Sequence, residues 1–178
     1  MIVLGVDPGT LVTGYGVIES KNGRIAVLGC DAIQNKSDRS MPLRLKLIFE
    51  RLMEVIDRYH PDEFAIETAF YGRNAQSALK LGHARGVAML AAVTREIPTT
   101  EYSPREVKKA VVGTGAASKE QVKAMVKTLL RMNTTPKFYD TTDALAVALC
   151  HLHRRPKRRS RPADWKAYVK ANPQRVKT

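Results

Sequence analysis

The chain changes early from short apolar runs to a helical repeat, and this order limits the folds that it can adopt. Residues 2–6 (Ile-Val-Leu-Gly-Val) form an apolar run that ends at Asp7-Pro8-Gly9-Thr10. A run of this length followed by turn residues predicts a buried strand. Residues 14–18 and 25–28 predict two further strands, with a hairpin turn over residues 21–24. Three consecutive strands favour a meander.

Beyond residue 41, helical spacing alternates with two more short strands. Apolar residues recur at intervals of three and four from Pro42 until Pro61, which predicts an amphipathic helix. Ser118 and Gln121 have capping-box spacing, which predicts the start of another helix that reaches about residue 130. The order of elements predicts an α/β fold, with a five-stranded mixed sheet flanked by helices. The other expected elements are strands at 63–67 and 99–102 and helices at about 74–95, 104–113 and 141–153.

Positive charge is concentrated at the carboxyl end of the chain. The net charge is +13 over 178 residues, and residues 151–178 contain ten Lys or Arg against one acid, which is +9 there and leaves +4 for residues 1–150. The length fits a single domain. We therefore expect one folded domain over residues 1–153 and a basic, poorly ordered extension over residues 154–178. Such a concentration of positive charge suits a polyanionic partner, of which nucleic acid is the first choice and a membrane surface the second.

The apolar runs and the cysteines indicate the cellular compartment of the protein. No apolar run approaches the ~20 residues that span a bilayer, and the start of the chain lacks the basic segment of a signal peptide. Cys30 and Cys150 each lie in an apolar stretch. The favoured interpretation is two buried free thiols in a reducing compartment, and a structural disulfide is the alternative. These features predict a cytoplasmic protein without a membrane partner.

Four acidic residues stand at the ends of predicted strands and at one predicted helix start. Asp7 follows the first strand and Glu67 ends the fourth, at the edge of the sheet where α/β proteins place their ligand chemistry. Asp140 and Asp143 are three residues apart, so they face one side of the first turn of the last helix. Mg²⁺ prefers oxygen ligands, and phosphodiester cleavage can use two such ions roughly 3.5–4 Å apart. The pattern predicts that these four carboxylates converge on one metal site.

Each acid alone also fits a structural role. Asp7 lies in Asp-Pro-Gly, a common turn sequence, and Glu67 fits a solvated strand end. Asp140 or Thr141 fits the cap of the last helix. The His-Leu-His run at residues 151–153 has metal-ligating groups, although a helix end beside an arginine run is the simpler interpretation. The combination of the four acids in this order is what favours a catalytic site.

The sequence contains, in this order, Asp7-Pro8-Gly9-Thr10 with residues 13–17, Ala65-Ile66-Glu67, residues 77–82 with Ala84-Arg85-Gly86, Val107-Lys108 with Val111-Val112-Gly113, and residues 140–146. From residue 2 to about His153, these motifs resemble those of the bacterial RuvC Holliday junction resolvases. The resemblance implies a ribonuclease-H-like fold, a homodimer, and two Mg²⁺ ions per active site, with Mn²⁺ as a substitute. It also implies paired symmetric nicks at a four-way DNA junction that leave 5′-phosphate and 3′-hydroxyl ends, beside a RuvA-RuvB branch-migration complex.

The resemblance and the residues together give the candidate site. The resemblance implies that Phe70 contacts DNA at the crossover and that Lys108 and Lys119 lie near the scissile phosphate. An aromatic side chain beside a metal site can stack on an unpaired base, and basic side chains bind phosphates. The alternatives are core packing for the second aromatic and simple solvation for the basic residues. The metal ligands implied by the resemblance are Asp7, Glu67, Asp140 and Asp143, and the further candidates for DNA contact are Tyr71, Arg73 and Lys80.

A pair of glycines bears on assembly. Gly82 and Gly86 are four residues apart in a predicted helix that is otherwise rich in Ala and Leu. This spacing is typical of close packing against a sheet or another helix, and we predict that the helix contributes to a dimer seam. A dimer with two-fold symmetry provides two active sites for two cuts in a symmetric junction.

Two other functions share parts of the pattern. Phosphotransferases of the actin and sugar-kinase type share the Asp-x-Gly-Thr turn, but they normally have two similar domains and are far longer. A non-catalytic nucleic-acid-binding protein on the same fold, or an RNA-processing relative, is the second alternative. The presence of all four acids favours retained catalysis.

Overall fold

The computed structural model, which describes residues 1–68, 75–132 and 138–154, contains one central mixed sheet. Its strands are β1 (Ile2–Asp7), β2 (Val12–Lys21), β3 (Arg24–Gln34), β4 (Glu63–Glu67) and β5 (Thr99–Tyr102). They lie in the order β3-β2-β1-β4-β5. β1, β2 and β3 pair antiparallel, whereas β4 pairs parallel with both β1 and β5. The predicted five-stranded mixed sheet and its opening meander are confirmed.

The hairpin between β2 and β3 extends beyond the predicted apolar runs. Its two-residue turn is Asn22-Gly23, with φ of 52° and 75°, as a tight hairpin requires. The pairing then continues as far as Val12 and Gln34. Because β3 is an edge strand with one face largely exposed, its outer half needs no continuous apolar run, so hydrophobicity alone marked only part of it.

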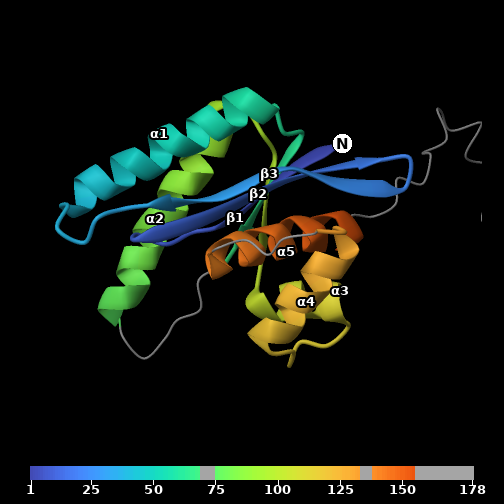
Figure 1. Ribbon diagram of the computed structural model, residues 1–178. Coiled ribbons are helices and arrows are strands. Elements are labelled where there is room, and N and C mark those ends of the chain that lie inside the picture. The colour runs from blue at the N-terminus through green and yellow to red at the C-terminus, as the bar shows by residue number, and fades with distance from the viewer. Residues whose placement is uncertain (69–74, 133–137, 155–178) are drawn as a thin grey trace, which may run out of the picture.

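Helices cover both faces of the sheet (Figure 1). α1 and α2 pack on one face, and α5 packs on the other with α3 and α4 beneath it. Pro42 lies in the first turn of α1, and Ser118 with Gln121 forms a capping box on α4, both as predicted. In the described ranges, no helix is long and apolar enough to span a membrane. The helices are α1 (Met41–Tyr59), α2 (Ala75–Thr94), α3 (Pro104–Val112), α4 (Lys119–Leu129) and α5 (Tyr139–Arg154).

The α5 helix is the most deeply buried helix of the fold. Residues 144–151 are all buried between the sheet and the pair α3 and α4. Cys150 lies in this buried stretch as a free thiol, whereas Cys30, also free, is only half-buried on β3. The expectation of two buried thiols therefore holds for Cys150 and is wrong for Cys30, because β3 lies at the edge of the sheet.

Candidate active site

Asp7 and Glu67 end two neighbouring parallel strands. β1 and β4 pair in a register that places Val6 beside Ile66. The next residues along each strand are Asp7 and Glu67, so both carboxylates leave the sheet at the same edge. The two strands are buried up to this point, because their apolar runs lie between helix layers on both faces.

The start of α5 brings the other two acids to this edge. Gly14 pairs with Asp7 across β1 and β2, and a Cβ atom at Gly14 would lie 2.0 Å from the backbone oxygen of Asp140. The first turn of α5 therefore rests directly on the strand backbone beside Asp7. Asp140 and Asp143 both lie inside the helix, which begins at Tyr139. The interpretation of Asp140 or Thr141 as the helix cap is thus wrong, since the helix starts earlier than its apolar period indicated.

The four carboxylates act on one another electrostatically. Burial raises the pKa of Asp7 to about 7, with further contributions from the charges of Asp143 and Asp140. Burial also raises the pKa of Glu67 to about 8, and the charges of Asp7 and Asp143 add to this effect. The pKa of Asp143 is raised by burial and by Asp140. Residues from three separate elements therefore form one acidic cluster.

Two lysines face the acidic cluster from α3 and α4. Lys119, the first residue of α4, lowers the pKa of Asp7, of Glu67 and of Asp143. Lys108, half-buried on α3, lowers the pKa of Glu67 and of Asp143. Both lysines named from the sequence thus lie within electrostatic reach of the acids.

Of the remaining predicted residues, the structure describes only Lys80. Lys80 is exposed on α2, in the helix layer on the opposite face of the sheet from α3 and α4. Phe70, Tyr71 and Arg73 lie outside the described residues. The described part of the site therefore consists of four acids and two lysines.

The chemistry of the donor set fits a hard divalent cation. All four groups are carboxylates, the oxygen ligands that Mg²⁺ prefers. Burial and crowding raise the pKa of Asp7, of Glu67 and of Asp143, and a nearby positive charge offsets both effects. Over the described ranges, no three His, Cys, Asp or Glu side chains are grouped closely enough to hold an ion as they stand. Ion binding therefore requires the carboxylates to draw together from neighbouring positions.

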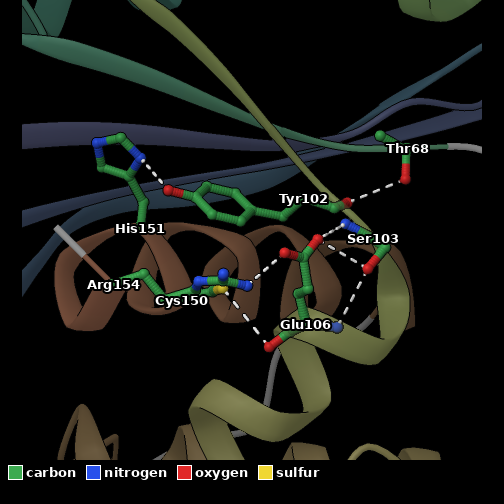
Figure 2. Close-up of polar contacts among 7 residues, drawn as sticks. All are labelled: Thr68, Tyr102, Ser103, Glu106, Cys150, His151 and Arg154. Carbon is green, nitrogen blue, oxygen red and sulfur yellow. Dashed lines mark hydrogen bonds and ion pairs between the residues drawn. The ribbon is translucent and has the colours of Figure 1, made fainter.

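A buried polar network fixes the far end of α5, and sequence reasoning missed it (Figure 2). The hydroxyl group of Tyr102 lies 3.0 Å from His151 Nδ1, and His151 Nε2 contacts the carboxylate of Glu63. Because an ionised carboxylate only accepts, His151 Nε2 donates to Glu63. Tyr102 pairs in register with Glu67. The network therefore ties the helix of Asp140 and Asp143 to the strand edge that carries Glu67.

Glu106 and the end of α5 form a second tie. Ser103 and Glu106 make the capping box of α3, and Arg154 binds the Glu106 carboxylate at 2.5 Å (Figure 2). His153 Nδ1 lies 3.1 Å from the backbone oxygen of Ala110. Both histidines at the helix end thus make contacts within the protein. The signal available from sequence was a histidine at 151 inside an otherwise apolar helix run, since a buried imidazole needs a partner.

Comparison with known proteins identifies relatives over the whole described domain. A family described as "Crossover junction endodeoxyribonuclease RuvC" matches residues 3–151. A protein of that name from Christiangramia forsetii is 46% identical over 99% of this chain and 93% of its own length. One from Saccharophagus degradans is 53% identical over 85% of this chain and 87% of its own length.

Solved structures agree with the sequence relatives. Thermus thermophilus RuvC in complex with Holliday junction substrate superposes with a TM-score of 0.81 at 34% identity, over 86% of this chain and 93% of that chain. A yeast mitochondrial Holliday junction resolvase, at 13% identity and a TM-score of 0.59, shares the fold alone. These neighbours confirm the predicted ribonuclease-H-like fold. The matched family region contains all four carboxylates and both lysines, so this chain belongs to the RuvC family of crossover junction endodeoxyribonucleases.

Proposed function

We propose that this protein resolves four-way (Holliday) DNA junctions. It hydrolyses one phosphodiester bond in each of two strands of like polarity and leaves 5′-phosphate and 3′-hydroxyl ends that can be ligated. The observation that carries the proposal is the cluster of four carboxylates beside two lysines at one edge of the sheet, in a member of this family. The T. thermophilus relative was solved with a Holliday junction.

In this proposal the acids bind metal ions and the lysines act on the DNA phosphate. Asp7, Glu67, Asp140 and Asp143 hold two Mg²⁺ ions, for which Mn²⁺ can substitute. Such a pair of ions supplies an activated water and stabilises the leaving oxygen. Lys108 and Lys119 bring positive charge to the scissile phosphate and offset the repulsion between the acids and the DNA backbone. The proposed DNA contacts outside this cluster are Phe70, Tyr71, Arg73 and Lys80.

A dimer supplies the second cut. Leu79, Leu90 and Val93 are exposed along α2, and a Cβ atom at Gly82 or Gly86 would meet nothing within 4 Å. The predicted close packing at these glycines is therefore not made within one chain. These exposed residues of α2 (Leu79, Gly82, Gly86, Leu90 and Val93) are called the α2 stripe. We propose that a second copy of this chain covers the α2 stripe in a two-fold dimer, which presents two active sites to a symmetric junction. By the family resemblance, the dimer works beside a RuvA-RuvB complex.

Cleavage of a synthetic junction tests the proposal. The substrates are a labelled four-way junction, a linear duplex of the same sequence and an RNA, each with Mg²⁺ and then with EDTA. The wild-type protein should cut the junction alone, at symmetric positions, and only with the divalent ion. Asp7→Asn should cut at least roughly a hundredfold more slowly, since even outer-shell changes at metal sites cost about 10–100-fold.

Junction binding by Asp7→Asn shows whether the variant loses cleavage alone or also loses recognition of the DNA. Asp7→Asn should bind the junction as tightly as the wild type or more tightly, because it removes a negative charge that repels phosphate. Asp38→Asn, a change in an exposed loop between β3 and α1, is the matched control and should cut normally. An Asp7→Asn protein that cuts at the wild-type rate would show that the site is wrongly assigned.

A further inference from the structure

Tyr139 is an exposed aromatic residue at the edge of the acidic cluster. It is the first residue of α5, directly before Asp140, and it is 54% exposed. Among the aromatic side chains that the structure describes, Tyr139 alone is exposed. The ring contributes little to the core and is open to contact from solvent.

An ammonium group lies over the ring. Lys123 Nζ is 4.4 Å from the centroid of the Tyr139 ring. This contact connects α4 to the start of α5. Lys123 is four residues after Lys119 and four before Lys127, so the three lysines form a row on one side of α4 with a spacing of about 6 Å. Lys119 is the member that acts on Asp7, on Glu67 and on Asp143. The row therefore starts at the acidic cluster and leads away from it along α4.

This arrangement suits the base and the phosphate of a nucleotide. An aromatic ring in solvent stacks with any base, because every base has a π-face. A lysine row at this spacing contacts successive phosphates of a strand. The Lys123 ammonium group over the Tyr139 ring places a base contact and a phosphate contact together, at the residue that precedes Asp140.

We propose that Tyr139 and Lys123 form a nucleotide contact for the DNA strand that enters the active site. The Tyr139 ring stacks on an unpaired base, and Lys123, with Lys127 beyond it, binds the adjoining phosphates. The inference rests on the proposed junction cleavage and adds a determinant of strand placement that the four carboxylates do not provide. A purely structural clamp between α4 and α5 is the competing explanation.

Binding of a fluorescent four-way junction, measured by anisotropy in EDTA over a series of salt concentrations, tests the contact without cleavage. The ring variants are Tyr139→Ala, Tyr139→Leu and Tyr139→Phe, where leucine keeps apolar bulk and phenylalanine keeps the ring. The charge variant is Lys123→Gln. Its matched control is Lys46→Gln, an exposed lysine on α1 in the opposite helix layer. The melting temperature of each variant is measured in parallel.

Stacking and phosphate contact predict separate changes. Tyr139→Ala and Tyr139→Leu should each weaken junction binding by roughly fivefold to a hundredfold with an unchanged salt slope. Tyr139→Phe should bind within about twofold of the wild type, because stacking does not need the hydroxyl group. Lys123→Gln should reduce the slope of log affinity against log salt by about 0.7–0.9. Lys46→Gln should leave affinity and slope unchanged.

Two outcomes would overturn the inference. If the ring variants and Lys123→Gln lower only the melting temperature and bind the junction like the wild type, the pair is a structural clamp. If Tyr139→Phe binds as weakly as Tyr139→Ala, stacking is the wrong chemistry. Cleavage of the junction by the wild-type protein, assayed alongside, distinguishes a failure of the proposed function from a failure of this inference. A wild type that fails to cut the junction refutes the proposed function, whereas normal cutting with unchanged binding by the variants refutes this inference alone.

Discussion

Asp7 and Glu67 retain protons in a pH range where most carboxyl groups are ionised. Their pKa values are about 7 and about 8, mainly because burial disfavours the charged form and secondly because neighbouring carboxylates repel it. A carboxyl group whose pKa is raised by folding binds its proton more tightly in the folded state. It therefore lowers the free energy of unfolding as the pH rises from its unfolded pKa to its folded pKa. For these two residues that interval runs from about pH 4 to about pH 8.

Neutralising Asp7 should stabilise the protein without metal at high pH. In EDTA at about pH 8, the free energy of unfolding of Asp7→Asn should be roughly 1–3 kcal/mol higher than that of the wild type, since each pKa unit corresponds to ~1.4 kcal/mol. This corresponds to roughly 2–10 °C in Tm. The difference should shrink at about pH 5, where the wild-type carboxyl group is protonated.

Calorimetry or thermal unfolding followed by circular dichroism gives the measurement. The exposed control Asp38→Asn should track the wild type at both pH values. Added Mg²⁺ should stabilise the wild type more than Asp7→Asn, because the ion compensates the charge that the variant lacks. An Asp7→Asn protein less stable than the wild type in EDTA at about pH 8 would contradict the electrostatic account of the cluster.

The α5 helix positions two of the four acids by lying directly on β2. Its first turn approaches Gly14 so closely that an added Cβ atom would meet the Asp140 backbone oxygen at 2.0 Å. At Gly16, on the same strand, the nearest obstruction is the side chain of Leu145, at 2.6 Å. Backbone atoms of a helix move only with the whole helix, whereas a leucine side chain can change its rotamer. The two glycines therefore differ in how strictly they set the position of the acids.

Gly14→Ala should displace the acids. The helix must shift to admit the methyl group, and we expect a loss of roughly 1–3 kcal/mol in unfolding free energy. Junction cleavage should fall by about tenfold or more, because small misplacements of catalytic groups have large effects on rate. Gly16→Ala should lose less activity. Single-turnover cleavage rates at saturating protein provide the comparison, and equal rates for the two variants would refute this role of Gly14.

The α2 helix carries the proposed dimer contact. Leu90 is 56% exposed on the α2 stripe, and Leu43 is 54% exposed on α1, so the two make a matched pair for substitution. Leu90→Glu should weaken dimerisation at least tenfold, or about 1.4 kcal/mol, by placing two desolvated charges at the two-fold seam. Leu43→Glu should leave it unchanged. Sedimentation at micromolar concentration measures both, and a wild type that sediments only as a monomer rejects the dimer.

The charge of the whole molecule is unevenly distributed. The described domain includes the acidic cluster and the lysine row, while residues 151–178 carry +9 of the total of +13. Polyanion binding depends on the number of phosphates neutralised, and this dependence is visible in the response to salt. We therefore predict that the basic extension strengthens DNA binding and takes no part in the chemistry at the acids.

Truncation after Arg154 tests the contribution of the extension. This end point keeps α5 and the ion pair between Arg154 and Glu106. The truncated protein should bind the junction more weakly, with a slope of log affinity against log salt that is smaller by about 2 or more. Its single-turnover rate at saturating protein should match that of the full chain. An unchanged slope would exclude the extension from DNA binding.

Local patterns in the sequence predicted most of the elements, and together with the family resemblance they gave the four acids as candidates. Strand β1, the start of α1 at Pro42 and the capping box at Ser118 follow from spacing and turn chemistry that act over a few residues. The parallel pairing of β1 with β4, which places Asp7 beside Glu67 at one edge of the sheet, came from the structure. The family resemblance then extended this reasoning to the metal and the substrate.

Contacts between distant segments were decided by the tertiary structure alone. His151 contacts Glu63 across 88 residues and Tyr102 across 49, and no local pattern specifies such partners. The raised pKa of Asp7 depends on how α5 buries it, and the exposed Tyr139 beneath Lys123 depends on how α4 meets α5. The sequence by itself predicted most strands and helices and the candidate acids, because strand and helix periods are short-range properties. Burial, protonation and partner choice were decided by packing, since each depends on segments that come together only when the chain folds.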